Sequence, residues 1–127
     1  MNLNDVGIGV DIENVKRFEK YSKDKDDAFV KRVYSESEID YCFKSKNPAK
    51  HLAVRFCAKE AVYKALCSVG VLDLGFKDIE IVHNKNKVPQ VIFLNDKYKN
   101  CKCKLSLSHS RESAIASAII VKEKTEN

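Results

Sequence analysis

The chain has 127 residues, of which 44% are hydrophobic and 32% charged, and its net charge is +5 at pH 7. This length suits one domain, so we expect a single domain over residues 1–127. The composition is typical of a globular protein and excludes the disordered and collagen-like classes. No apolar run reaches the roughly 18 residues that a membrane-spanning helix needs, and the first residues lack the pattern of a secretory signal.

The five cysteines are odd in number, and Cys101 and Cys103 lack the Cys-x-x-Cys spacing of zinc and redox sites. We therefore expect free thiols in a reducing compartment, which predicts a cytoplasmic protein. The modest positive charge fits nucleic acid, an anionic cofactor or an acidic protein partner, and charge alone does not choose among them.

Residues 6–12 alternate in a pattern that predicts a β-strand. One face carries Val6, Ile8, Val10 and Ile12, and the other carries Gly7, Gly9 and Asp11. Glycine inside a strand often marks close approach by another backbone or by a ligand. The pattern leaves both alternatives open for the face that carries Asp11.

The next segment is expected to be helical. Residues 14–33 read as helix, with an interruption near the KDKDD charge run at 23–27. Ser35 followed by Glu38 predicts a capping box that opens a second helix through about Lys44.

The strongest helical segment covers residues 49–68, after the break at Asn47-Pro48. Gly70 lies just beyond it, where a helix often ends on a left-handed residue. At 100° per residue, one stripe of this helix collects Ala53, Phe56, Cys57, Glu60, Lys64 and Cys67.

The second half of the chain changes to strand patterns. The expected strands are 77–83, 88–94, 104–109 and 114–121. Helices therefore crowd the first half and strands the second, with one strand at the start. This order predicts an α+β fold, with a mostly antiparallel sheet packed against a long central helix.

Glu60 and Lys64 are four residues apart on the stripe of the central helix. Such a pair usually lies on a solvated face, where it contributes a few tenths of a kcal/mol. Here the helix is apolar or small around most of its circumference, which is typical of a buried helix. A half-buried Glu60 needs a cation, and the candidates are Lys64 or a metal ion.

Arg55 and Glu60 lie about 140° apart around the helix axis, so they do not easily serve one pocket in one subunit. One interpretation is that Arg55 and Lys59 extend to solvent. The alternative is that the helix runs through a subunit interface and serves two sites.

Two further groups could carry chemistry. Asp11 and Glu60 are hard oxygen ligands on different elements, and two carboxylates with substrate phosphates and waters are a usual site for Mg²⁺. A polar cluster near a strand end suits an anion such as phosphate, or is only a serine-rich turn; it comprises Ser106, Ser108, His109, Ser110 and Arg111. His51 and His83 have no constellation around them, and we interpret both as structural or surface residues.

Three segments follow one another along the chain: GIGVDI around Asp11, RFCAKEAVYKA around Glu60, and LSLSHS, which ends at Ser110. Together they resemble the bacterial-type holo-acyl-carrier-protein synthases, which are 4′-phosphopantetheinyl transferases. The resemblance covers nearly the whole chain, and KEAxxKA is its specific element. It implies transfer of 4′-phosphopantetheine from coenzyme A to a serine of apo acyl carrier protein, for fatty acid biosynthesis, with release of adenosine 3′,5′-bisphosphate.

The resemblance also implies residue roles. Asp11 and Glu60 would bind Mg²⁺, with Mn²⁺ an alternative, and either Glu60 or a metal-bound water would take the serine proton. Lys64 would stabilise phosphate charge, so Asp11, Glu60 and Lys64 form the expected catalytic group. Lys59 would support the site less directly.

By the same resemblance, coenzyme A would be bound by Arg55, Lys64, His109 and Ser110. The angle of about 140° between Arg55 and Glu60 indicates that Arg55 reaches the cofactor of a neighbouring subunit. Family members of this length are homotrimers with active sites between subunits. Acidic carrier proteins would dock on Arg17, with Lys16 and Lys20 close by.

The chain departs from the family pattern in two turns: CSVGV at 67–71 keeps only Gly70 of a Gly-Thr-Gly-like turn, and NKNKVP has no glycine. A relaxed transferase of peptide and polyketide synthases is the runner-up, although such enzymes are about twice this length. A small nucleic-acid-binding domain is the alternative from another class. It would need aromatic residues among lysines and arginines on an exposed strand face, which the sequence does not favour.

Overall fold

The computed structural model of the chain describes residues 2–123, so Met1 and residues 124–127 of the expected domain lie outside the described residues. Its α-helices are α1 (Ala28–Val33), α2 (Glu36–Phe43) and α3 (Pro48–Ser68). Its strands are β1 (Val6–Asn14), β2 (Ile79–His83), β3 (Pro89–Phe93), β4 (Cys101–His109) and β5 (Ser113–Lys122). Short 3₁₀ helices are η1 (Leu3–Asp5), η2 (Val15–Tyr21), η3 (Phe76–Asp78) and η4 (Asp96–Tyr98).

The helix boundaries follow local capping. The predicted capping box opens α2, because the Ser35 hydroxyl accepts from the Glu38 N–H at 3.3 Å and Glu38 Oε1 accepts from the Ser35 N–H at 2.9 Å. After α3, Gly70 adopts a φ of +88°, as its position predicted. The prediction of helix over residues 14–33 was only partly right. Asp27 caps the separate helix α1 by accepting from the Phe29 N–H, so the charge run forms a turn.

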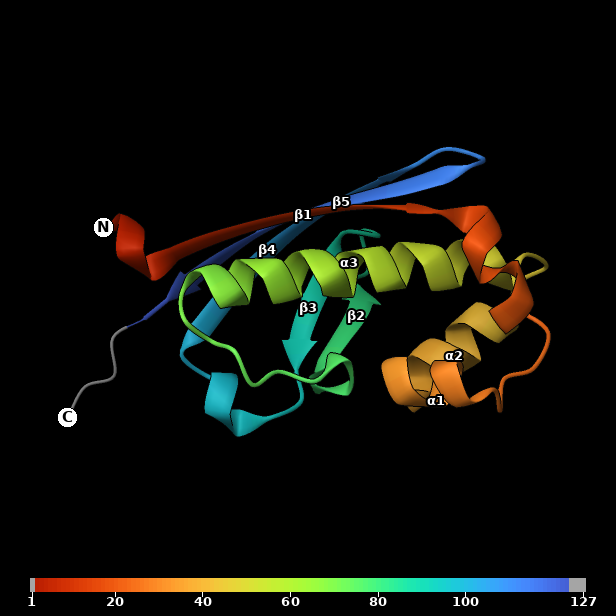
Figure 1. The fold of residues 1–127 in the computed structure, drawn as a ribbon, viewed down its shortest axis with the longest axis horizontal. Helices are drawn as coiled ribbons and strands as arrows, with labels where there is room; N and C mark the ends of the chain where they lie inside the picture. The colour runs from red at the N-terminus through yellow and green to blue at the C-terminus, as the bar shows by residue number, and fades with distance from the viewer. Residues whose placement is uncertain (1, 124–127) are drawn as a thin grey trace.

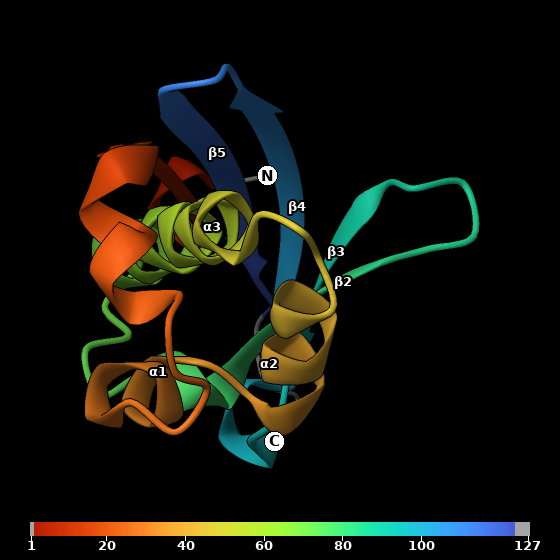
Figure 2. The ribbon, with the colours of Figure 1, turned by 90° about the vertical axis from the view of Figure 1, so that its right-hand side faces the viewer.

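The sheet is antiparallel, and the predicted α+β class is confirmed (Figure 1). Three strands lie in the order β1–β5–β4, while β2 and β3 form a separate two-stranded hairpin. Strand β4 begins at Cys101, three residues before the predicted start, because Cys101 pairs with Lys122 of β5. Helix α3 packs across one face of the three-stranded sheet, and Figure 2 looks along it, with the β2–β3 hairpin reaching away to one side.

The glycines of β1 are explained by this packing. A Cβ atom added to Gly7 or Gly9 would overlap the carbonyl oxygens of Ala65 and Ala61 on α3. The sequence left open whether a backbone or a ligand approaches these glycines, and the structure shows that it is the backbone of α3. It brings β1 against the helix with Asp11 on the same face, directed toward α3.

Two hydrophobic clusters hold the elements together. One lies between α3 and the sheet and is built largely from small side chains, such as Ala58, Ala61 and Ala118. The other packs aromatic rings of η2, α1 and α3, including Phe18 and Phe56 with ring centroids 5.3 Å apart. Within residues 2–123, none of the helices combines the length and the apolar character required to cross a membrane.

The opposite face of the sheet carries exposed apolar side chains. The apolar residues of β1 point away from α3 and are joined by two isoleucines of β5: Ile8, Val10, Ile12, Ile115 and Ile119. Ile8 lies opposite Ile119, and Ile12 lies opposite Ile115, so the five residues form one patch. We call it the outer apolar face.

Candidate active site

The Asp11 side chain extends from β1 toward α3, and its two carboxylate oxygens have different surroundings. Its Oδ1 is 3.4 Å from the Lys64 ammonium nitrogen, which also donates to the Val10 carbonyl at 3.1 Å. Its Oδ2 is buried and has no hydrogen-bond partner among residues 2–123. The Cys57 thiol donates to the Asp11 backbone carbonyl at 3.1 Å, which ties this part of β1 to the helix. Asp11 thus offers a buried acceptor that needs a donor or cation.

Glu60 is half-buried on the same flank of α3, as the stripe analysis predicted. Burial raises its pKa, and the negative charge of Asp11 raises it further, whereas Lys64 and Arg17 lower it. The two carboxylates are therefore close enough to repel each other. Lys64 is 50% exposed and is only one of the two cations that act on Glu60.

Glu13 is a third carboxylate of this site, and the sequence analysis missed it. Its pKa is raised from 4.5 to about 7 by burial and by the neighbouring Asp11 carboxylate, while Arg17 lowers it. An Arg17 nitrogen lies 2.6 Å from Glu13 Oε1. The alternation of residues 6–12 could have indicated it, because position 13 continues the face of Gly7, Gly9 and Asp11.

The residues predicted to bind a carrier protein lie beside this acidic cluster. The Arg17 guanidinium lies over the rings of Phe18 and Phe56, at 5.3 and 5.1 Å from their centroids. Lys16 and Lys20 are exposed on η2. Acidic and basic side chains thus meet at the end of β1.

Arg55 lies outside the acidic cluster, in the wall of a separate cavity. It is only 3% exposed, and its guanidinium lies 4.1 Å from the ring centroid of Tyr41. Its Nε has no hydrogen-bond partner in the region that the structure describes. Lys59 is also buried, so the interpretation that Arg55 and Lys59 extend to solvent is wrong. Arg55 lines a cavity of about 290 Å³ together with His109, as well as His51 and His83. The prediction that His51 and His83 have no functional groups around them was also wrong. Strands β2 and β4 pack near α3 and bring both histidines into the same cavity as Arg55.

Ser110 and His109 lie at the β4–β5 turn. Ser110 Oγ accepts from the Ser113 N–H at 3.1 Å, so this serine stabilises the turn. His109 and Ser110 also line a second cavity, of about 210 Å³, next to Ile12. The structure brings His109 to Arg55 but places both away from Glu60, on a different flank of α3.

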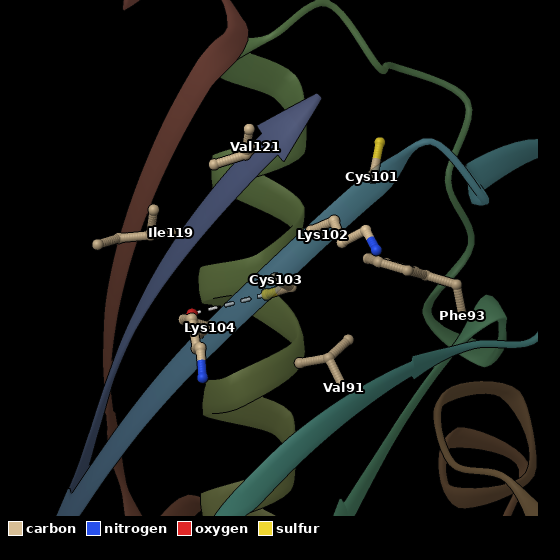
Figure 3. Close-up of a pocket in the computed structure, with 8 residues that line it drawn as sticks. All are labelled: Val91, Phe93, Cys101, Lys102, Cys103, Lys104, Ile119 and Val121. Carbon is tan, nitrogen blue, oxygen red and sulfur yellow. Dashed lines mark hydrogen bonds between the residues drawn. The ribbon is translucent and has the colours of Figure 1, made fainter. Parts of the chain in front are cut away.

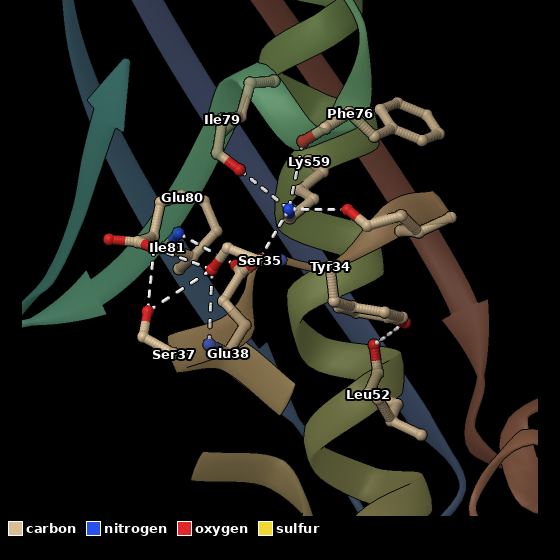
Figure 4. A network of polar contacts seen from close by, with 11 residues as sticks. Tyr34, Ser35, Ser37, Glu38, Leu52, Lys59, Phe76, Ile79, Glu80 and Ile81 are labelled. Atoms are coloured by element: carbon tan, nitrogen blue, oxygen red, sulfur yellow. Dashed lines mark hydrogen bonds and ion pairs between the residues drawn. The ribbon is translucent and has the colours of Figure 1, made fainter. Parts of the chain in front are cut away.

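Lys59 is completely buried, and its ammonium group points toward the backbone of Phe76 and Ile79 (Figure 4). Its ammonium nitrogen lies 2.6 Å from Glu38. It also donates to three carbonyl oxygens, of Val33 at 2.8 Å, Phe76 at 3.0 Å and Ile79 at 2.7 Å. Lys59 therefore joins α3 to α1, α2 and β2 rather than contacting the candidate site.

A groove of about 380 Å³ lies elsewhere, between β3 and β4 (Figure 3). Its lining includes Val91 and Phe93 from β3 and Cys101 and Cys103 from β4. None of the predicted site residues lines it. Within residues 2–123, no three or more histidine, cysteine or acidic side chains are arranged as a metal cage.

Comparison with known proteins defines the class. A family model described as the 4′-phosphopantetheinyl transferase superfamily matches residues 7–119, and the chain belongs to this superfamily.

Within it, the chain is similar to proteins named holo-[acyl-carrier-protein] synthase. The relative from Geobacter sp. (strain M21) is 36% identical, with 90% of this chain and 96% of the relative covered. The one from Clostridium kluyveri is 39% identical, with 95% and 93% covered.

Solved structures agree. A holo-(acyl-carrier-protein) synthase from Bacillus anthracis in complex with CoA (3′,5′-ADP) has a TM-score of 0.76 at 32% identity, covering 92% of this chain and 96% of that one. The enzyme from Helicobacter pylori in complex with coenzyme A has a TM-score of 0.73 at 35% identity, covering 91% and 99%. The predicted family is confirmed.

Proposed function

We propose that the chain is a holo-[acyl-carrier-protein] synthase. It transfers 4′-phosphopantetheine from coenzyme A to a serine of apo acyl carrier protein and releases adenosine 3′,5′-bisphosphate. The observation that carries the proposal is its 36% and 39% identity, over almost the full length, to proteins of this name. Use in fatty acid biosynthesis in the cytoplasm is part of the proposal, and the five free cysteines support a reducing compartment.

The acidic cluster is the proposed catalytic centre. Lys64 is half-exposed beside Asp11, so its ammonium group can donate to a phosphate oxygen and stabilise charge that develops there. Glu60 is a half-buried carboxylate of the same cluster, close to Asp11 and Lys64. Glu60 is the side chain proposed to accept the proton of the attacking serine, directly or through a water molecule.

Asp11 and Glu60 fit a Mg²⁺ ion, with Mn²⁺ an alternative. Among residues 2–123 the buried Asp11 Oδ2 has no hydrogen-bond partner. The negative charges of Asp11 and Glu60 repel each other, and a cation between them would relieve this repulsion. Two hard oxygen ligands, completed by phosphates and waters, are sufficient for Mg²⁺, which is seldom held by a cage of protein ligands alone. When bound, the ion supplies neutralisation of charge on the pyrophosphate.

The cavity around Arg55 is the proposed site for the nucleotide end of coenzyme A. A buried guanidinium with no acidic partner among residues 2–123 favours a phosphate ligand. His109 lines the same cavity, and Ser110 lies beside it at the turn.

A homotrimer would bring the acidic cluster of one subunit next to the Arg55 cavity of another. Arg55 and Glu60 face different flanks of α3, so a complete site would combine Asp11, Glu60 and Lys64 of one subunit with Arg55 of its neighbour. The outer apolar face supports association, since Ile8 is 71% and Ile12 67% exposed. The basic residues Arg17, Lys16 and Lys20 are proposed to dock the acidic carrier protein.

The test is transfer itself. Purified protein is incubated with coenzyme A and apo acyl carrier protein, with Mg²⁺ or with a chelator, and the carrier is weighed by intact-mass spectrometry. We expect a Mg²⁺-dependent gain of one phosphopantetheine group, which Glu60→Gln abolishes. Glu36→Gln, at an exposed carboxylate on α2, is the matched control and should stay active. An active Glu60→Gln variant would refute the assigned mechanism, and salt-sensitive oligonucleotide binding without coenzyme A binding would favour the nucleic-acid alternative.

A further inference from the structure

The cavity around Arg55 is rich in groups that carry or can acquire positive charge. Lys50 and Arg55 come from α3, and Lys87 comes from the β2–β3 turn. Three imidazoles complete the set: His51, His83 and His109. Its remaining titratable group is the phenol of Tyr41, and no carboxylate is found among the described residues that line it. The cavity therefore selects for anions.

Arg55 itself indicates a ligand. It is 97% buried, no carboxylate lies within ion-pair distance among the described residues, and its Nε has no hydrogen-bond partner. A buried guanidinium without an acid is costly, because its charge and its donors are both uncompensated. The planar fork of the guanidinium matches the oxygens of a phosphate group.

Tyr41 holds the two extra imidazoles next to this guanidinium. Arg55 lies 4.1 Å from the Tyr41 ring centroid. His51 meets the same ring edge-on with centroids 5.4 Å apart, and His83 stacks on it with centroids 6.1 Å apart. One exposed tyrosine thus gathers Arg55, His51 and His83 at the wall of a single cavity.

We propose that His51 and His83 are phosphate-binding residues of this cavity, and that they take up protons when a phosphate monoester of the coenzyme A substrate binds beside Arg55. The inference rests on the proposed function, because it assumes that coenzyme A is the ligand. The proton comes from solvent, and the resulting N–H⁺ donates to a phosphate oxygen. No covalent bond to the ligand is made or broken.

The electrostatics of the cavity give the direction of the effect. In the free protein the pKa of His51 is lowered by burial and by the charges of Arg55 and Lys50, with His109 and His83 adding to the effect. The pKa of His83 is lowered by burial and by Arg55. A dianionic phosphate offsets much of this positive charge, so both pKa values rise on binding. Coenzyme A should then bind more tightly as the pH falls.

The experiment is calorimetric titration of the full chain with coenzyme A, at about pH 6, 7 and 8 and in two buffers of different ionisation enthalpy. We expect the affinity of the wild type to fall roughly tenfold more between about pH 6 and pH 8 than that of His51→Gln/His83→Gln, and proton uptake to shrink in the variant. The phosphate monoester also titrates in this range, but the ligand and the rest of the cavity, His109 included, are common to both proteins.

Three further titrations test the role of the histidines separately. His83→Gln alone, at an exposed position, should lose part of the pH dependence without disturbing folding. Lys87→Gln removes a lysine from the cavity wall and leaves both imidazoles in place, so it should weaken binding by a similar factor at each pH. Coenzyme A lacking its 3′-phosphate has no phosphate monoester, and its binding should lose the extra pH dependence.

The outcomes separate the inference from the proposed function. Wild-type binding with the same pH dependence and proton uptake in both histidine variants would overturn the role of His51 and His83, while coenzyme A would remain the ligand. Absence of coenzyme A binding by the wild type at every pH would overturn the proposed function, and this inference with it.

Discussion

Asp11 Oδ1 lies 3.4 Å from the ammonium group of Lys64, whereas the buried Oδ2 of the same carboxylate finds no hydrogen-bond partner in the described part of the chain. Lys64 is half-exposed and satisfies only one side of Asp11, while Glu60 adds a second negative charge nearby. This imbalance favours a cation and a phosphate ligand over a closed structural ion pair. It also predicts that catalysis and stability respond differently to substitution here.

Asp11→Asn should abolish transfer without unfolding the protein. Removing the charge relieves its repulsion of Glu60, so we expect the free energy of unfolding near pH 7 to stay within about 1 kcal/mol of wild type or to rise. Activity should fall by at least about 100-fold, because the proposed cation site loses a ligand. Urea unfolding and the mass-shift assay measure the two quantities. Loss of folding with loss of activity would contradict the separation.

Glu13 should make the stability of the metal-free protein depend on pH. Its folded-state pKa of about 7 exceeds its ordinary 4.5, so the folded state binds this proton more tightly than the unfolded state. The contribution is therefore fully present below about pH 4.5 and is lost as pH rises to about 7. Urea unfolding of wild type and Glu13→Gln in the presence of a chelator should show a smaller decline for the variant across this range. Parallel curves would refute the assignment.

Lys59→Met should destabilise the fold by about 3–5 kcal/mol, because Glu38 would remain buried without its cation. The double variant with Glu38→Gln should recover part of this loss. The matched control is Lys97→Met, which breaks an exposed pair with Asp73 and should destabilise the chain far less than Lys59→Met. Chemical denaturation measures all three, and equal losses at the two lysines would contradict the structural role of Lys59.

Gly9→Ala should destabilise the chain strongly, because its Cβ would overlap the backbone of α3 at Ala61. We expect a loss of more than about 2 kcal/mol and reduced activity, since β1 also carries Asp11. Gly75→Ala is the control, because its Cβ would have an ordinary contact at 3.5 Å and should change stability by less than about 1 kcal/mol. Thermal unfolding distinguishes the two, and a neutral Gly9→Ala would show that helix and strand can separate.

Mixing two inactive variants tests whether subunits share a site. Asp11→Asn and Arg55→Gln should each be inactive alone. If a site combines Asp11 of one subunit with Arg55 of its neighbour, random mixed assemblies should recover about a quarter of wild-type activity. Light scattering before and after mixing checks the oligomeric state. No recovery from mixed assemblies of confirmed composition would place both residues in one subunit.

The sequence predicted much of the fold from local signals. The capping box at Ser35 and Glu38, the break before Pro48 and the glycine after α3 all depend on neighbouring residues, so they can be read from the chain. The charge run at 23–27 was less informative. It forms a turn that ends in the cap of α1, and the preceding segment is a 3₁₀ helix.

Asp11 and Glu60 were identified from the sequence because each stands out on its own element: the first on a glycine-lined strand face, the second on an apolar helix stripe. Their proximity, the shared field that includes Glu13, and the choice of backbone over ligand beside Gly7 and Gly9 depend on how β1 crosses α3. The burial of Lys59 and Arg55, and the joining of His51 and His83 in one cavity, likewise required the tertiary structure. Local pattern determines which residues share a face, but burial and electrostatic coupling depend on partners far away in the sequence.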